Sequence, residues 1–503
     1  MGSTTLRSRR SFLTLSVFGV AGTALLAACG APAAPAPTAA PAKPTEAPKA
    51  AEAPKPTEAP KPTEAPKAAA PEPTKPAAAA PTTAPAAAKG VIELRVHDWL
   101  QDPDDKTYGP FIKKIEDENP NIKIKREWFP RADMHTKQLT LAATGQIGDV
   151  VRANVAPMTA ELKVKNVVQA LDPFIKSDTN WANNDHKQFW PGNIATYTIQ
   201  GQQWGYPVVG HPGCLHYYYN ADQIEKAGGK LPPADPKTWK YADVIEMFKA
   251  GTIKSADGRI TAYGVQPCLG GEGAVAVLRS YGGNYYNEEG TKCLINTPES
   301  IAGLQYLYDL YNTHKVAIPY DPALNYQETF PSGRVSVWIG TALAGTIKNL
   351  VGTKFRWSVN PPPIGPTGKF ETQVSSDGIC ISKATKVPEA AWIYIKYYVS
   401  KDFGIVRHLA GLGSPGSRYD VWTDPRFKQE QPLLSSIIYD NLINPEKAPP
   451  LRPWSYPANG RYNEADTAMN NILADVWLGK KQPKEAAEEA FKTVQAIMDK
   501  PPT

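Results

Sequence analysis

Two absences divide this 503-residue chain before any motif is considered. The first 28 residues contain no acidic residue, and residues 31–89 contain no aromatic residue. A segment without aromatic side chains has too little apolar surface to offset the entropy of an ordered chain. Beyond residue 28, no segment has the long uncharged apolar run of a membrane span. The sequence therefore predicts an N-terminal targeting segment, an unfolded spacer and a globular part that begins near residue 90.

The N-terminus has the pattern of a secretory signal. Arg7, Arg9 and Arg10 precede an apolar stretch, Leu15–Ala28, that glycine and threonine interrupt. A basic start followed by a short apolar region and small residues is typical of a signal peptide. The stretch is short for a membrane-spanning helix, although a retained signal anchor is the alternative.

Two short motifs within residues 1–29 indicate the export route and the processing of this signal. The segment "SRRSFL" (Ser8–Leu13) resembles the twin-arginine export signal, and "LAAC" (Leu26–Cys29) resembles the bacterial lipobox. The lipobox resemblance implies that residues 1–28 are removed and that Cys29 carries a lipid. We therefore expect Cys29 to anchor the protein, with no redox or catalytic role.

Residues 29–89 are expected to form a disordered tether. The stretch 31–89 contains 16 prolines, and "KPTEAP" recurs at 43–48, 55–60 and 61–66. Frequent proline favours extended polyproline-II segments, at about 3.1 Å per residue where they form. The sequence predicts a spacer that holds the globular part away from a membrane.

The charge of the globular part gives little support for nucleic-acid binding. The whole chain carries +6, of which residues 1–28 contribute +3 and the tether +2, so residues 90–503 carry about +1. Phosphate binding needs concentrated basic charge. The 414 residues from Gly90 to Thr503 are enough for two lobes.

Four cysteines remain in this globular part: Cys214, Cys268, Cys293 and Cys380. Outside the cytoplasm a disulfide is permitted, and Cys268 with Cys293 is the preferred pair. Four free thiols remain the alternative, because sequence does not establish connectivity.

The start of the globular part alternates between two hydrophobic periods. Residues 91–99, 121–129 and 149–155 have the pattern of strands, and residues 109–120 and 132–145 that of helices. This strand–helix order favours an α/β sheet with parallel strands. Three further helices are predicted at 296–314, 389–404 and 484–499.

Segments along nearly all of this part resemble, in order, the extracellular solute-binding proteins of ABC importers. The resemblance is to their sugar-binding group, which includes maltose-binding protein. The segments that carry it include "GPFIKKIEDENPNIKIKREWF" (109–129), "TLAATGQIGDVV" (140–151), "WGYPVVGHPGCLHYYYNADQIEKAG" (204–228), "FPSGRVSVWIG" (330–340) and "ADTAMNNILADVWLGKKQPKEAAEEAF" (465–491). The second segment lacks a proline that the family has before the aspartate.

The resemblance implies an α/β, two-lobe periplasmic-binding-protein-like fold of type II, with a ligand cleft between the lobes. It places crossing segments near Tyr206–Gly210, near Pro362–Gly368 and after Val399. The N-terminal lobe would comprise residues 90–207 plus about 365–400. The C-terminal lobe would comprise residues 208–364 plus about 401–503.

Sugar recognition needs flat aromatic faces for the C–H side of a ring and planar polar groups for its hydroxyls. Trp99 ends the first strand, where strand ends in open α/β sheets face the ligand crevice, although it could instead pack. Arg152 and Asn154, on the third predicted strand, could donate to hydroxyls or a carboxylate; a surface ion pair is the alternative for Arg152. The other candidates are Trp204, Tyr206 and His211 at the first crossing, with Glu272, Trp338, Thr341, Asp377, Arg418 and Trp454 later in the chain.

Tyr206 could instead pack the hinge, and the carry-over to Trp454 is the loosest. His211, Cys214 and His216 would permit a metal interpretation, but no second metal-like pair is obvious, and we expect neither metal nor cofactor.

The expected function is solute binding without catalysis. The partners would be a small solute, most simply a neutral mono- or oligosaccharide, and the permease subunits of an ABC importer. The protein would be a monomer, lipid-anchored to the outer face of the cytoplasmic membrane, with no nucleic-acid partner. Two alternatives stay open: a tethered polysaccharide-degrading enzyme, and a cell-envelope adhesion module. No G-x-S-x-G, H-E-x-x-H or G-x-x-x-x-G-K-[ST] motif occurs.

Overall fold

The structure is a computed structural model that describes residues 90–213, 216–372 and 374–502. The signal segment, Cys29, the tether and Cys214 therefore lie outside the described residues. Within those ranges, no helix is long and apolar enough to cross a membrane.

One five-stranded sheet forms the core of an N-terminal lobe. Its strand order is β2 (Ile122–Trp128), β1 (Ile92–Asp98), β3 (Val150–Ala153), β12 (Gly378–Ile381) and β6 (Tyr206–Pro207). β1 runs parallel to β2 and to β3, as the strand–helix alternation predicts. β12 returns from far along the chain and pairs antiparallel with β3 and β6.

Helices of the expected period cover this sheet. α1 (Tyr108–Glu118) buries Tyr108, Phe111 and Ile115, which share one face because they are three and four residues apart. α12 (Pro388–Tyr398) packs into the same cluster through Trp392, Tyr394 and Tyr398. Because the carboxyl end of β1 lies beside these helices, the residues that follow β1 are held by a rigid frame.

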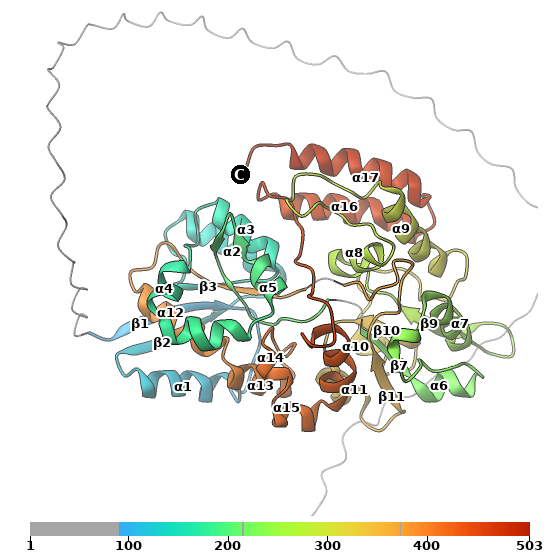
Figure 1. Cartoon of the computed structure of the whole chain (residues 1–503), viewed down its shortest axis with the longest axis horizontal. Helices are drawn as coiled ribbons and strands as arrows, with labels where there is room; N and C mark the ends of the chain where they lie inside the picture. The colour runs from blue at the N-terminus through green and yellow to red at the C-terminus, as the bar shows by residue number, and fades with distance from the viewer. Residues whose placement is uncertain (1–89, 214–215, 373, 503) are drawn as a thin grey trace, which may run out of the picture. The chain divides into compact units, whose positions relative to one another are not determined.

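A second five-stranded sheet forms the core of a C-terminal lobe (Figure 1). Its order is β11 (Trp357–Asn360), β7 (His216–Asn220), β10 (Val335–Gly340), β9 (Ile260–Gln266) and β8 (Ile253–Lys254). β9 and β10 are parallel, so their carboxyl ends meet at one edge of the sheet.

Helices α8 (Gly271–Ser280), α9 (Pro298–Tyr311), α16 (Tyr462–Trp477) and α17 (Pro483–Met498) share one buried cluster with β7, β9 and β10. Figure 1 shows α17 above α16, with α9 beside α16 and α8 below it, so the end of the chain belongs to the C-terminal lobe. The expected helices at 296–314 and 484–499 correspond to α9 and α17.

The remaining elements complete the two lobes and the segments between them. The helices are α2 (Arg131–Ala143), α3 (Ala156–Val164), α4 (Asp172–Ser177), α5 (Pro191–Thr196), α6 (Ala221–Lys226), α7 (Tyr241–Gly251), α10 (Tyr326–Thr329), α11 (Ala344–Val351), α13 (Lys401–Leu409), α14 (Tyr419–Trp422) and α15 (Pro425–Glu430), with 3-10 turns at His186–Gln188 and Pro236–Thr238 and π-helical segments at Trp181–Asp185 and Leu434–Ile443. β4 (Thr198–Ile199) and β5 (Gln202–Gln203) form a two-stranded sheet.

The single helix predicted over 389–404 is wrong. The structure ends α12 at Tyr398 and starts α13 at Lys401. The hydroxyl of Ser400 accepts a hydrogen bond from the Phe403 amide, which is the N-cap contact of a new helix. The two segments therefore have helical period but not one axis.

Three segments pass between the lobes and bond to one another. The amide of Val208 donates to the Asp377 carbonyl at 2.8 Å, and that of His211 donates to Ser375 at 2.9 Å. From the third segment, the Gly416 amide donates to Gly210 at 3.2 Å. These backbone bonds tie the crossings into one bundle at the base of the lobes.

The second crossing lies later in the chain than Pro362–Gly368. Those residues are fastened to the C-terminal lobe, since the Ile364 amide donates to Trp239 at 2.8 Å and Gly365 lies against Ser280. The passage itself runs through Thr372–Asp377, where Ser375 pairs with His211. The lobe boundary predicted near residue 365 would therefore move to Thr372–Asp377, and the boundaries near 207 and 400 stay predictions.

Candidate functional site

A cavity of about 390 Å³, here called the interlobe cavity, lies where the two lobes and the crossing segments meet. The N-terminal lobe contributes Trp99, Arg131, Val155 and Asp377; the crossings contribute Val209, His211, Gly413 and Ser414; the C-terminal lobe contributes Cys268, Gly270, Thr341, Leu343, Trp454 and Tyr462. Trp99 directly follows β1, and Thr341 directly follows β10. The cavity thus lies at strand ends, where open α/β sheets bind ligands.

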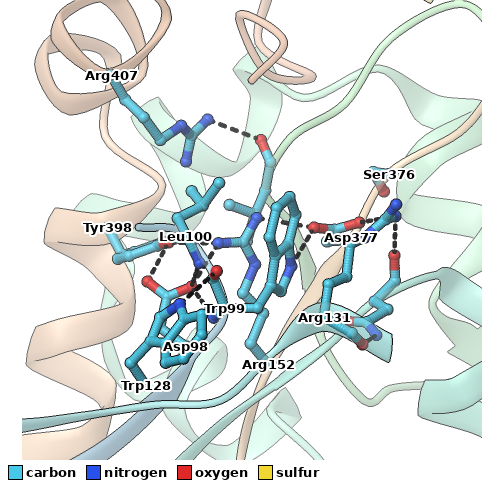
Figure 2. A network of polar contacts seen from close by, with 12 residues as sticks. Asp98, Trp99, Leu100, Trp128, Arg131, Arg152, Ser376, Asp377, Tyr398 and Arg407 are labelled. Atoms are coloured by element: carbon cyan, nitrogen blue, oxygen red, sulfur yellow. Dashed lines mark hydrogen bonds and ion pairs between the residues drawn. The ribbon is translucent and has the colours of Figure 1, made fainter. Parts of the chain in front are cut away.

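Trp99 enters this cavity with its ring fixed (Figure 2). Its indole nitrogen Nε1 donates to Asp377 Oδ2 at 2.9 Å. The guanidinium carbons of Arg131 and Arg152 each lie 4.8 Å from its ring centroid, within the range of a cation–π contact. The indole nitrogen of Trp128 donates to the Trp99 carbonyl at 2.8 Å. Trp99 is half-buried, so part of its surface remains open to a ligand.

A buried ion network lies behind Trp99. Arg152, 1% exposed, donates from Nη1 to Asp98 Oδ1 at 2.7 Å and from Nη2 to Asp377 Oδ2 at 2.8 Å. Asp98 also accepts from the hydroxyls of Tyr108, at 2.8 Å, and Tyr398, at 3.0 Å. Arg152 therefore fixes Asp377, and Asp377 fixes the indole of Trp99 (Figure 2).

The charges of this network are stabilised by one another. Burial alone would raise the pKa of Asp98, but Arg152 and Arg126 outweigh it and hold the pKa below its ordinary value. Burial alone would likewise lower the pKa of Arg152, whereas Tyr398, Asp98 and Asp377 raise it well above the ordinary value. Both residues are charged in the folded protein. The ion pair between Arg152 and Asp377 therefore holds the carboxylate that binds the Trp99 indole.

Two further aromatic rings line the interlobe cavity, and they contact each other. Trp454 is 7% exposed, and its ring meets that of Tyr462 edge to face, with centroids 6.3 Å apart. The amide of Trp454 donates to the Thr196 hydroxyl at 3.1 Å, so a residue of the N-terminal lobe positions it. With Trp99, three aromatic residues therefore line the interlobe cavity.

The polar groups of the cavity come from several elements. Asn154 donates from its side-chain amide to the carbonyl of Arg131, which places Arg131 at the start of α2. His211 accepts from the Gly213 amide at Nδ1, at 3.2 Å. The carbonyl of Thr341 accepts from the Tyr218 hydroxyl at 2.9 Å. A guanidinium, a backbone carbonyl and an imidazole thus accompany the aromatic residues, and such groups can bond to ligand hydroxyls.

Five of the twelve ligand residues expected from the sequence line this cavity: Trp99, His211, Thr341, Asp377 and Trp454. Arg152 and Asn154 lie behind it and position Asp377 and Arg131. The backbone of Glu272 lies near the start of α8.

Four expected residues lie elsewhere. Trp204 donates to the Ile199 carbonyl at 3.2 Å, and Tyr206 is fully buried, with its hydroxyl bonded to Trp181 and His186. Trp338 is 6% exposed and stacks on Tyr218, with ring centroids 4.9 Å apart. Arg418 pairs with Asp420 at 2.7 Å and Asp185 at 2.9 Å. In this structure these four side chains make packing and ion-pair contacts rather than line the cavity.

The preferred disulfide is wrong, since Cys268, Cys293 and Cys380 are all free thiols. Cys293 lies fully buried in the C-terminal core, and burial raises its pKa to about 11. Cys268 lies at the interlobe cavity instead. Among the described residues, no group of three or more His, Cys, Asp and Glu side chains could hold a metal ion.

The sequence reasoning missed several lining residues, of which Arg131 and Tyr462 matter most. Arg131 begins the helix that follows β2, so the rule that strand ends face the crevice, applied to the second strand as to the first, would have found it. Tyr462 starts a helix at the far end of the chain, and no local signal connects it with Trp454. Gly413 and Ser414 lie in the "GLGSPGS" segment, from which only the following Arg418 was considered.

Comparisons with known proteins identify the family to which this two-lobe chain belongs. The family model for bacterial extracellular solute-binding proteins matches residues 98–404. The arabinooligosaccharide-binding protein of Halalkalibacterium halodurans is 23% identical over 401 residues, covering 75% of this chain and 83% of that protein.

Two solved structures show the same fold. The ABC substrate-binding protein of Listeria monocytogenes, in complex with cycloalternan, matches with a TM-score of 0.66 at 20% identity, covering 81% of this chain and 98% of that one. Maltose-bound MalE3 of T. maritima matches with a TM-score of 0.64 at 21% identity, covering 80% and 99%. The expected α/β two-lobe fold is confirmed, and the chain belongs to the bacterial extracellular solute-binding proteins.

Proposed function

We propose that this protein is the substrate-binding lipoprotein of an ABC importer, which captures a mono- or oligosaccharide and delivers it to a membrane permease. The observation that carries this proposal is the lining of the interlobe cavity, which combines Trp99 of the N-terminal lobe with Trp454 and Tyr462 of the C-terminal lobe. Aromatic faces pack against the C–H side of a sugar ring, and the polar groups between them bond its hydroxyls. Because both lobes contribute, closure around a sugar would change their relative position and signal occupancy.

The relatives support a saccharide as the solute. The Halalkalibacterium halodurans protein is named as an arabinooligosaccharide-binding protein, and the two structural neighbours hold cycloalternan and maltose. The low identity leaves the particular sugar open, so these ligands define the class to be tested first.

A glycoside hydrolase would need a different site. Its mechanism requires two positioned carboxyl groups, one on each side of the scissile bond. Among the described lining residues of the interlobe cavity, Asp377 is the only carboxylate, and Arg152 and Trp99 occupy its Oδ2 atom. This lining favours binding over hydrolysis, and over an adhesion role that would need no such cavity.

The N-terminal targeting segment supports an exported, membrane-anchored protein. A twin-arginine-like signal, Cys29 and a proline-rich tether together would place the globular part on the outer face of the cytoplasmic membrane. The family's extracellular character agrees with export. The protein would act there as a monomer beside its permease.

The central test is calorimetric titration of the purified chain with maltose, malto-oligosaccharides, arabino-oligosaccharides and, as controls, amino acids. We expect one of the saccharides to bind with saturation and to raise the melting temperature, because a ligand at 100 times Kd stabilises the folded state by about 2.7 kcal/mol. The saccharide should be recovered intact. Release of shorter products would instead support the hydrolase.

The anchor has its own test. In the native host, Cys29→Ser should move the protein from the membrane fraction to the soluble exported fraction, while sugar affinity stays the same. A variant that remains in the membrane fraction would contradict lipid attachment at Cys29.

A further inference from the structure

A second cavity, of about 410 Å³, lies in the C-terminal lobe and is here called the lobe cavity. Its lining resembles that of the interlobe cavity in kind, since it combines three aromatic rings with three planar polar groups. These residues are Tyr311, Tyr320, Trp477, Gln266, Asp321 and Asn470. Its volume lies in the range of small-molecule sites.

The two cavities meet at one residue. Gly270 lines both of them, and apart from Gly270 and its two chain neighbours no atom of the described residues lies within 4 Å of the position that a Cβ on Gly270 would occupy. The neighbouring strand ends agree with this continuity. Gln266 ends β9 and lines the lobe cavity, whereas Thr341 follows β10, the parallel neighbour of β9, and lines the interlobe cavity. The same edge of the C-terminal sheet therefore carries both cavities.

Helix α16 runs along the same path. Tyr462, its first residue, lines the interlobe cavity, and Asn470 and Trp477 line the lobe cavity. At about 1.5 Å per residue, Asn470 lies about 12 Å and Trp477 about 22 Å along the helix from Tyr462. A ligand that reaches both cavities must therefore be elongated.

The lobe cavity combines partly exposed tyrosine rings with side-chain amide groups. Trp477 is 4% exposed and lies beside Tyr311, with centroids 6.4 Å apart, while Tyr311 and Tyr320 are half-buried. The side-chain oxygen of Gln266 accepts from the Thr329 hydroxyl, which leaves its amide nitrogen as a donor to a ligand. Asn470 donates to Asp466 at 3.0 Å, which leaves its oxygen as an acceptor.

We propose that the lobe cavity is a second saccharide subsite, and that the natural ligand is an oligosaccharide of several units. One end of the ligand lies in the interlobe cavity, and the chain passes Gly270 along α16 toward Tyr320. This inference rests on the proposed saccharide function and names its substrate class: an elongated oligosaccharide rather than a monosaccharide.

The test is calorimetric titration of the full chain with malto- and arabino-oligosaccharide series of two to seven units. In the wild type, affinity should rise with length until the lobe cavity is filled. Tyr320→Ala should lower the affinity for the longest chains about five- to tenfold and leave that for the shortest unchanged, because the ring contacts distal units alone.

Tyr308→Ala is the matched control, because Tyr308 is also half-buried against the C-terminal core but lines neither cavity. It should change no affinity in either series. Equal affinity for short and long chains, or an equal loss at every length in Tyr320→Ala, would overturn the second subsite while the proposed function stands. If no saccharide of any length binds, the proposed function itself falls, and the subsite with it.

Discussion

A series of polar contacts fixes the position of the Trp99 ring. Asp377 holds its indole nitrogen, Arg152 holds Asp377, and Asp98 holds Arg152. A ring that is fixed before the ligand arrives loses little side-chain entropy on binding. The buried ion network therefore contributes to affinity without touching the ligand.

Trp99→Ala should weaken saccharide binding about tenfold or more, because it removes one aromatic wall of the interlobe cavity. Trp204→Ala is the control, since Trp204 is also half-buried in the N-terminal lobe but does not line the cavity. Calorimetric titration of both variants with the best-binding saccharide checks this expectation. Equal losses in the two variants would mean that the ring acts through lobe stability alone.

Asp98→Asn should destabilise the N-terminal lobe by about 3 kcal/mol, because it leaves the buried Arg152 with one charged partner fewer. Asp117→Asn, at an exposed pair with Lys113, should change the free energy of unfolding by less than about 0.5 kcal/mol. Urea unfolding at pH 7 measures both.

The stability difference between the wild type and Asp98→Asn should also depend on pH. The folded-state pKa of Asp98 lies below its ordinary value of 3.8. The charged carboxylate therefore stabilises the fold above pH 3.8, and this contribution is lost as the pH falls below that value. The difference between wild type and Asp98→Asn should narrow in that range. A difference that stays constant there would contradict the assignment of the charge.

Among elements, the junction of α12 and α13 has a consequence that can be measured. α13 contributes Phe403 to the core of the N-terminal lobe, and its next turn reaches a cluster that includes Trp190 and Trp422. Ser400→Ala removes the N-cap hydrogen bond of α13 and should cost about 1 kcal/mol, whereas Ser400→Asn keeps a capping oxygen and should cost much less. Urea unfolding of the pair checks this. Equal stability of both variants would show that the cap contributes nothing.

The sequence predicted elements better than it predicted side-chain partners. The strands and helices of the N-terminal lobe follow from local periods of two and 3.6 residues. Trp338 does not line the interlobe cavity, and the sequence could not indicate this, because all six residues of β10 are buried and no alternation of exposure distinguishes a ligand-facing side from a packed one. Arg418 pairs with Asp185, more than 200 residues away in the chain, and such a contact leaves no local pattern.

At the scale of the whole molecule, buried histidines connect the stability of both lobes to pH. Burial lowers the pKa of His97 on β1 to about 4, of His216 on β7 to about 3 and of His408 on α13 to about 4. Each is therefore neutral in the folded protein at neutral pH, while the unfolded chain takes up a proton near pH 6.5. Their stabilising contribution is full above pH 6.5 and is lost progressively as the pH falls toward 4 and 3.

His216 offers the cleanest test of this coupling, because it is fully buried and neither ring nitrogen has a hydrogen-bond partner among the described residues. Burial lowers the folded-state pKa of His216 to about 3, so proton uptake by this residue in the unfolded chain should lower the wild type's free energy of unfolding by on the order of 2 kcal/mol between pH 7 and pH 5. His216→Leu takes up no proton there, and it also removes two unsatisfied polar atoms from the core. We therefore expect the urea midpoint of the variant to fall less than that of the wild type between these two pH values. Parallel decreases in both proteins would mean that other groups account for the acid sensitivity.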